Sequence, residues 1–154
     1  MLNRIKGQQD FIGLNYYFSS CIHYGLNKNA NEVISDMGWE VRPEGIYFVL
    51  QDLKKYGKPI YITENGLADT KDEKRAKFIL DTLTQVHRAI QDGVDVRGYL
   101  HWSLMDNFEW DSGFWPRFGL IEIDRKTLKR TPRPSAYVYR DICLKNSILK
   151  KFNG

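Results

Sequence analysis

The chain has 154 residues, of which 42% are hydrophobic and 27% charged, as expected for one globular domain spanning residues 1–154. Its net charge of +4 lacks the dense basic stripe of a nucleic-acid-binding protein, so no nucleic-acid partner is expected. No apolar run approaches the roughly 20 residues of a membrane span, which argues against a membrane partner.

The first residues contain no apolar signal-peptide core, and the two cysteines, Cys21 and Cys143, have no paired spacing. Both features favour a cytoplasmic protein in a reducing compartment. The histidines His23, His87 and His101 lack the spacing of metal ligands, so neither a metal nor a cofactor is expected. We expect Cys143 to be a small core residue and His101 to be packed or hydrogen-bonded.

Strands and helices alternate along the predicted chain. Runs rich in β-branched and aromatic residues predict strands, and apolar residues at a period of 3.6 predict helices. In chain order we expect a strand over 10–17, a helix over 43–56, a strand over 59–64, a helix over 72–92, a strand over 96–102 and a helix from about 134. This α/β order implies parallel strands, either in a doubly wound sheet or in part of a (β/α)8 TIM barrel.

A long aromatic loop over 103–118 follows the third predicted strand. It contains five aromatic residues, and a loop of this length is uncommon unless it is functional or disordered. Disorder is unexpected for a segment so rich in aromatic side chains. We therefore expect this loop to contribute to a functional site.

Each predicted strand carries an unusual residue at its C-terminal end. These residues are Asn15 and Tyr17 in the first strand, Glu64 in the second and Trp102 in the third. Strict alternation places Glu64 on the same face as Ile60 and Ile62. Active sites of parallel α/β folds lie at this end of the strands.

The chemistry of these residues fits glycoside cleavage, which requires two carboxyl groups about the scissile bond. Glu64 is a candidate nucleophile, and the Tyr17 hydroxyl is placed to donate a hydrogen bond to it. Trp102 and Trp110 offer aromatic faces for a sugar ring, and the Glu109 carboxylate can accept hydrogen bonds from sugar hydroxyls.

Five ordered segments now resemble one known family, glycoside hydrolase family 1, which contains β-glucosidases and β-galactosidases with a (β/α)8 barrel. The segments are 10–17 (DFIGLNYY), 62–66 (ITENG), 102–110 (WSLMDNFEW), 117–120 (RFGL) and 130–136 (RTPRPSA). The resemblance covers the C-terminal part of the family only. It implies that the three predicted strands are strands six to eight of the TIM barrel.

The resemblance implies a role for each candidate. Glu64 matches the nucleophile that forms a glycosyl-enzyme intermediate with retention of configuration, and Tyr17 matches the tyrosine that supports it.

The remaining candidates match residues that bind the sugar. Asn15 matches an asparagine of the sugar site, and Trp102 matches the platform under the ring. Glu109 matches the glutamate at the 4- and 6-hydroxyls, Trp110 the tryptophan at the 3-hydroxyl, and Phe118 an aromatic near the 6-position. Because the Glu109 carboxylate would repel a phosphate, a non-phosphorylated β-glucoside or β-galactoside is the expected substrate.

The family's general acid/base is a glutamate in an Asn-Glu-Pro segment on strand four, and this sequence has no such segment. Two hypotheses therefore stay open. The chain is the C-terminal part of a retaining β-glycosidase, either truncated or acting with a separate N-terminal half that carries the acid/base. Alternatively, it is a non-catalytic sugar-binding or vestigial fragment. Both predict exposed barrel edges and a poorly stable or associating monomer.

Overall fold

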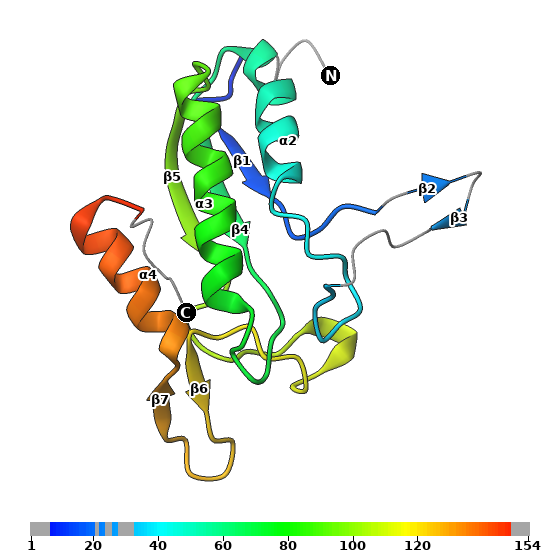
Figure 1. Ribbon diagram of the computed structural model, residues 1–154, viewed down its shortest axis with the longest axis vertical. Helices are drawn as coiled ribbons and strands as arrows, with labels where there is room; N and C mark the ends of the chain where they lie inside the picture. Colours follow the sequence, from blue (N-terminus) through cyan, green and yellow to red (C-terminus); the bar gives the residue numbers. More distant parts are fainter. Residues whose placement is uncertain (1–6, 21, 24–25, 28–32, 149–154) are drawn as a thin grey trace.

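The computed structural model describes residues 7–20, 22–23, 26–27 and 33–148, so Cys21 and the side chain of His23 lie outside the described residues (Figure 1). Three parallel strands form the central sheet in the order β1-β4-β5. Their bounds are Ile12–Asn15, Ile60–Asn65 and Val96–His101. Each lies within one residue or so of a predicted strand, except that β1 ends before Tyr16 and Tyr17.

Three α-helices follow the strands in the expected order. They are α2 (Gly45–Leu53), which continues as the short 3-10 helix η1 (Lys54–Tyr56), then α3 (Arg75–Gln91) and α4 (Pro134–Lys145). Gly57 adopts a left-handed φ of 59° directly after η1, and Gly93 adopts a φ of 82° beyond α3, so glycine ends both segments as predicted. Pro134 occupies the first turn of α4, where its missing N–H removes no helical hydrogen bond.

The predicted start of the second helix at Asp72 is wrong by three residues. Asp72 has a φ of 58°, which no helical residue can adopt. Its carboxylate instead accepts hydrogen bonds from the backbone N–H and hydroxyl of Ser135, at 2.8 and 2.6 Å. The loop before α3 is thereby tied to the start of α4.

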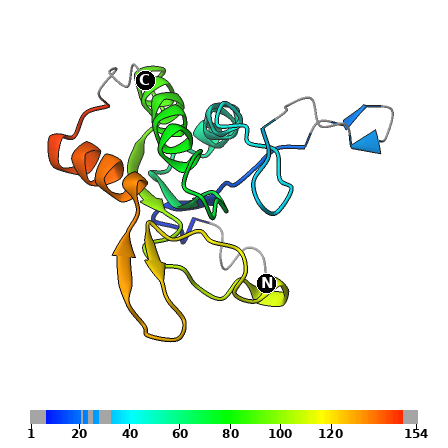
Figure 2. The ribbon, with the colours of Figure 1, turned by 60° about the horizontal axis from the view of Figure 1, so that its bottom comes forward.

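Two short antiparallel pairs complete the described structure. One joins β2 (Ile22–His23) to β3 (Leu26–Asn27), and the other joins β6 (Ile121–Ile123) to β7 (Arg130–Pro132). A short 3-10 helix, η2 (Trp110–Ser112), lies in the loop between β5 and β6. In Figure 2 the β6–β7 hairpin projects away from the side of the sheet that α2 and α3 cover.

The core lies between the sheet and these two helices (Figure 2). Ile60 and Ile62 of β4 are at most 1% exposed and pack against Ile46 and Leu50 of α2, with Val86 of α3 in the same cluster. Ile12 and Leu14 of β1 pack against this cluster. Alternation along β1 therefore turns Phe11, Gly13 and Asn15 to the opposite face of the sheet.

That opposite face is partly apolar and open. Phe11 is 53% exposed and Leu100 is 54% exposed. The Phe11 ring contacts the Tyr61 ring at 5.3 Å, edge to face. Among the described residues, no strand pairs with the outer edge of β1 or of β5.

The prediction that Glu64 shares a face with Ile60 and Ile62 is wrong. Leu14 pairs with Ile62, but the next residue, Asn15, pairs with Glu64, so β4 contains one extra residue. Such a bulge places two residues opposite one and reverses the alternation beyond it. Asn65 takes the buried position after Ile62, and Glu64 turns toward the face that carries Asn15.

No helix within the described ranges is both long and apolar enough to cross a membrane.

Candidate active site

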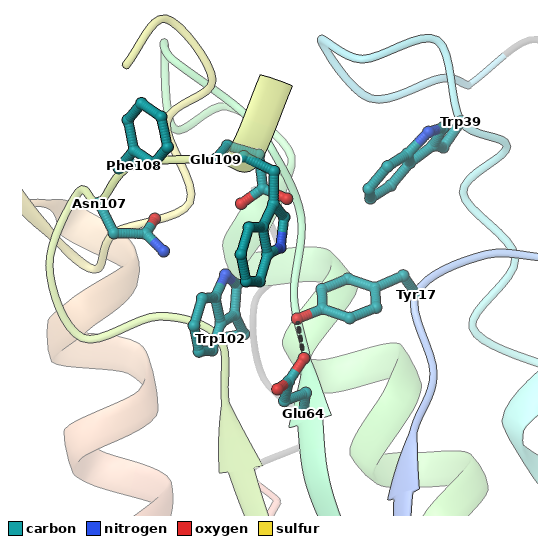
Figure 3. Close-up of a pocket in the computed structure, with 8 residues that line it drawn as sticks. Tyr17, Trp39, Glu64, Trp102, Asn107, Phe108 and Glu109 are labelled. Carbon is teal, nitrogen blue, oxygen red and sulfur yellow. Dashed lines mark hydrogen bonds between the residues drawn. The ribbon is translucent and has the colours of Figure 1, made fainter. Parts of the chain in front are cut away.

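A pocket of about 300 Å³ opens at the C-terminal end of the sheet (Figure 3). One of its residues lies two positions after β1, one lies in β4 directly before its last residue, Asn65, and one directly follows β5. The others come from the segments before α2 and after β5. They are Tyr17, Trp39, Glu64, Trp102, Asn107, Phe108, Glu109 and Trp110. The site thus brings together five of the seven residues predicted from the sequence.

Tyr17 and Glu64 form the polar centre of the pocket. The Tyr17 hydroxyl donates a hydrogen bond of 2.7 Å to Glu64 Oε2, drawn as the dashed line in Figure 3. Burial and the hydrogen bond to the Glu64 carboxylate raise the pKa of Tyr17 well above its usual range. Tyr17 therefore remains a proton donor to Glu64 at any pH at which proteins normally work.

Asn65, a residue that the sequence analysis missed, holds the three strands together next to Tyr17 and Glu64. Asn65 is fully buried, and its Nδ2 donates to the Tyr16 carbonyl at 2.6 Å. Its Oδ1 accepts a hydrogen bond of 2.8 Å from the Tyr99 hydroxyl. One side chain thus links all three strands immediately beside Tyr17 and Glu64.

Trp102 enters the pocket directly after β5. Its backbone N–H donates to the Asn65 carbonyl at 2.9 Å, which extends the β4–β5 pairing to the edge of the pocket. Gly66 permits this approach, because a Cβ there would lie 1.8 Å from the Trp102 carbonyl oxygen. Glycine after Asn65 is therefore a steric requirement of the site.

Glu109 supplies the second carboxylate of the pocket. Its backbone N–H donates to the Gly113 carbonyl at 2.6 Å, which closes the turn around η2. Burial raises the pKa of Glu109, and the negative charges of Glu64 and Asp111 raise it further. Trp110 also lines the pocket, although 79% of it is exposed.

Two predicted sugar-binding residues lie outside the pocket lining. Phe118 is fully buried, and its ring packs edge to face against Tyr17 at a centroid distance of 6.1 Å. Asn15 lies on the open face of the sheet, where its Oδ1 accepts a hydrogen bond of 2.6 Å from the Thr63 hydroxyl. Phe118 therefore packs against the Tyr17 ring without lining the pocket.

Trp39 is a pocket residue that sequence reasoning missed. It lies before α2, stacks on Phe18 at 5.0 Å and contacts the Tyr17 ring edge to face at 5.9 Å. In Figure 3 it lies on the opposite side of the pocket from Asn107 and Phe108, which were also missed. An isolated aromatic in a segment without periodicity was the signal that could have identified it.

Other predicted features lie away from the pocket. His101 Nδ1 and the Tyr99 hydroxyl share a hydrogen bond of 3.3 Å, and the His101 ring packs on Tyr139. The prediction that His101 is packed or hydrogen-bonded is therefore confirmed. Burial, with the nearby Arg75 charge, lowers the pKa of His101 to about 3. The expectation that Cys143 is a core residue is wrong, because Cys143 is exposed on α4. The part of the chain that the structure describes contains no group of three His, Cys, Asp or Glu residues arranged for a metal ion.

The sequence matches the family described as Glycosyl hydrolase family 1 over residues 1–148. It is 45% identical to a β-galactosidase of Sulfolobus acidocaldarius over 94% of this chain and 33% of that protein. It is 39% identical to a 1,4-β-D-glucan glucohydrolase of Thermotoga neapolitana, over 96% of this chain and 37% of that protein. The chain thus spans about a third of the length of the curated relatives it matches.

Solved structures give the same result. A β-glycosidase from Pyrococcus horikoshii superposes with a TM-score of 0.85 at 50% identity, over 92% of this chain and 36% of that one. A β-glucosidase from Thermotoga maritima in complex with glucoimidazole gives a TM-score of 0.88 at 35% identity, over 95% and 37% of the two chains. These structural neighbours are TIM-barrel enzymes, of which the mixed α/β structure here matches about a third. By sequence match and by structure, the chain belongs to glycosyl hydrolase family 1.

Proposed function

We propose that this chain provides the nucleophile and part of the sugar-binding site of a retaining β-glycosidase. The substrates are non-phosphorylated β-glucosides or β-galactosides, and the setting is cytoplasmic carbohydrate metabolism. One observation carries the proposal: the Tyr17 hydroxyl donates to Glu64 at 2.7 Å within a pocket lined by aromatic side chains. The names of the relatives, β-galactosidase and β-glucosidase, support the same class of reaction.

In the first step, a Glu64 carboxylate oxygen attacks the anomeric carbon and the bond to the leaving-group oxygen breaks. The product is a covalent glycosyl-enzyme ester, and the departing oxygen takes a proton from a general acid. In the second step, a water molecule attacks the same carbon and releases the Glu64 carboxylate. The proton that the water loses goes to the group that acted as general acid. Tyr17 holds the Glu64 carboxylate in one orientation and stays protonated throughout.

Sugar recognition is assigned to the wall opposite Glu64. The Trp102 ring offers an apolar face to the C–H surface of the sugar, and the Glu109 carboxylate accepts hydrogen bonds from its 4- and 6-hydroxyls. Trp110 adds a contact near the 3-hydroxyl. Asn15 and Phe118 act only indirectly, because neither lines the pocket.

We further propose that the general acid/base comes from polypeptide outside these 154 residues. A retaining enzyme needs the second carboxyl group at roughly 5–5.5 Å from the nucleophile. The sequence has no Asn-Glu-Pro segment, and we assign Glu109 to sugar hydroxyls. Strands β1, β4 and β5 would serve as strands six to eight of a barrel. A segment with the other strands, on a separate N-terminal half or the same longer chain, would cover the open face near Phe11 and Leu100.

The second candidate function is sugar binding without turnover. The observation that favours it is the pocket itself, where Glu64 and Glu109 are the carboxylates of the described lining. A chain with this pocket and no acid/base would bind a sugar and cleave ordinary β-glycosides slowly or not at all.

Trapping with a 2-deoxy-2-fluoro-β-glucoside carrying a dinitrophenolate leaving group tests the proposal. This leaving group departs without acid assistance, so Glu64 alone can form the ester. We expect one added fluoroglycosyl mass on the peptide that contains Glu64, and none on the Glu64→Gln variant. Label on another carboxylate would refute the nucleophile assignment, and pocket binding without label would favour the sugar-binding function.

A further inference from the structure

The loop that carries Glu109 and Trp110 is anchored at one buried carboxylate, that of Asp106. Asp106 is 4% exposed, and its Oδ1 accepts hydrogen bonds of 3.0 Å from the Gly119 N–H and of 3.0 Å from Arg133 Nη1. Its Oδ2 accepts a bond of 3.0 Å from Arg133 Nη2. This two-pronged pairing fixes the orientation of the carboxylate as well as its position.

Arg133 connects the loop to α4 and to the chain leading into β6. It is 6% exposed and directly precedes Pro134, the first residue of α4. Its Nη1 also donates to the Gly119 carbonyl at 2.6 Å, and its backbone N–H donates to the Leu120 carbonyl at 2.8 Å. The Asp106–Arg133 pair thus joins the start of the loop, the end of the loop and the last helix.

The Asp106 carboxyl is ionised in the folded protein. Burial acts to raise the pKa of Asp106, but hydrogen bonds and charge from Arg133, with the Gly119 and Ile123 N–H groups, outweigh it and hold that pKa below its usual range. Arg117 Nη1 also donates to Asp106 Oδ2, but at the longer distance of 3.4 Å. Removing Arg133 therefore leaves the buried Asp106 carboxylate more weakly compensated, and removing the Asp106 charge leaves the buried Arg133 guanidinium without its carboxylate partner.

Glu109 has no comparable support of its own. Within the described part of the chain, its carboxylate makes no hydrogen bond to another side chain. Only its backbone is bonded: the N–H donates to the Gly113 carbonyl at 2.6 Å, and the carbonyl accepts from the Ser112 N–H at 2.9 Å. The carboxylate therefore goes where the loop backbone places it. Asp106 lies three residues before Glu109, on the same loop.

We propose that Asp106 and Arg133 are positioning residues that hold the Glu109 carboxylate at the sugar-binding wall of the pocket. The part of this inference that concerns sugars rests on the proposed function. The part that concerns the loop rests only on the contacts of Asp106 and Arg133.

The first test measures sugar selectivity by titration calorimetry. The probes are 1-deoxynojirimycin and its analogue without the hydroxymethyl group, and the variants are Asp106→Asn and the milder Arg133→Lys. We expect each variant to lose about ten-fold more affinity for deoxynojirimycin than for the analogue, matching the selectivity change of Glu109→Gln. Asp106→Asn combined with Glu109→Gln should show no further change in selectivity. Equal losses for both probes would indicate a merely structural role and overturn the proposal.

The second test needs no ligand. Amide hydrogen exchange of residues 107–113 should accelerate about ten-fold or more in Arg133→Lys, while α3 keeps its protection. The control is Asp81→Asn, which removes an exposed ion pair with Lys77 on α3 and should leave the loop unchanged. Unchanged exchange at 107–113, or uniform acceleration over the whole chain, would overturn the positioning role. If the wild-type chain binds neither probe, the proposed function fails and the exchange result still decides the positioning role.

Discussion

Asn65 Nδ2 donates a hydrogen bond of 2.6 Å to the backbone carbonyl of Tyr16, so the residue after the candidate nucleophile holds the residue before its tyrosine partner. Two hydrogen bonds therefore hold the ends of β1 and β4 together. One is the buried bond from Asn65 to the Tyr16 carbonyl, and the other is the 2.7 Å bond from the Tyr17 hydroxyl to Glu64 in the pocket. The Asn65–Tyr16 hydrogen bond is buried, so water does not compete for it.

Replacing Asn65 by alanine should destabilise the protein and disturb the pocket together. The substitution leaves the Tyr16 carbonyl and the Tyr99 hydroxyl without their partner inside the core. We expect a loss of about 2–3 kcal/mol in the free energy of unfolding, measured by urea denaturation. The matched control is Gln91→Ala at the exposed end of α3, for which a change above about 0.5 kcal/mol would undermine the interpretation.

The bulge beside Asn65 also shows where the sequence was insufficient. Alternation along β4 is correct for Ile60 and Ile62 but fails at Glu64, because the extra residue is defined only by the pairing of Asn15 with Glu64. That pairing joins residues far apart in the chain, so no local pattern contains it. The prediction that Glu64 and Tyr17 lie together held because both lie at the C-terminal ends of neighbouring parallel strands, Glu64 within β4 and Tyr17 just after β1.

The other site residues also divide into those fixed by a local pattern and those fixed by packing between distant segments. Trp102 was predictable because it directly follows a recognisable strand. Phe118 and Trp39 lie in irregular segments, where side-chain direction depends on packing: one is buried behind Tyr17 and the other lines the pocket. Helix ends were predictable at Gly57 and Gly93, but not at Asp72, where a φ of 58° accompanies hydrogen bonds to Ser135, far along the chain on α4.

Replacing Tyr17 by phenylalanine removes the donor to Glu64 and keeps the ring packed on Phe118 and Trp39. We expect the rate of fluoroglycosyl labelling at Glu64 to fall about ten-fold, since one hydrogen bond to a charged group is lost. Mass spectrometry of labelled peptide against time measures this rate. Tyr47→Phe, which removes a donor to Asp92 on the surface, is the control and should leave the rate unchanged.

The raised pKa of Tyr17 predicts that the protein loses stability at high pH. The folded-state pKa of Tyr17 is raised above its unfolded value, so the folded state favours the protonated phenol. Its contribution is fully present below the unfolded pKa of about 10 and is lost as the pH rises toward the folded value. Denaturation midpoints of the wild type should therefore fall above about pH 10, and the fall should be smaller in Tyr17→Phe. Identical profiles for the two proteins would contradict this.

Glu109→Gln should stabilise the chain at neutral pH while weakening sugar binding. The folded-state pKa of Glu109 is raised, so the wild type is favoured while Glu109 is protonated and loses that advantage as the pH rises through the raised value. Removing the charge should add roughly 0.5 kcal/mol at pH 7, a small value because the pocket is open to solvent. Urea midpoints should converge below about pH 4, where the wild-type carboxyl is protonated. Glu122→Gln on exposed β6 is the control, and an equal gain there would point to net charge as the cause.

Gly66→Ala should displace Trp102. The added Cβ would lie 1.8 Å from the Trp102 carbonyl oxygen and 2.8 Å from its carbonyl carbon, so the β4–β5 pairing must open at the pocket. We expect a loss of about 3 kcal/mol or more and altered tryptophan fluorescence. Gly13→Ala on the same sheet is the matched control, because the three heavy atoms nearest its Cβ would all belong to the Thr63 side chain, the closest at 3.3 Å. Comparable losses in the two variants would show that the approach of Gly66 to Trp102 is not limiting.

Leu100→Ser should reduce self-association of the isolated chain. Leu100 is 54% exposed on the open face of the sheet, close to strand edges without partners in the described structure. Such faces and edges associate with other copies when nothing covers them. Sedimentation velocity at several concentrations should show wild-type association that Leu100→Ser weakens, with a stability change below about 0.5 kcal/mol. Leu144→Ser removes an apolar side chain that is 77% exposed but belongs to α4 and not to the sheet. An equal effect of Leu144→Ser, or a monomeric wild type at all concentrations, would show that the open face does not drive association.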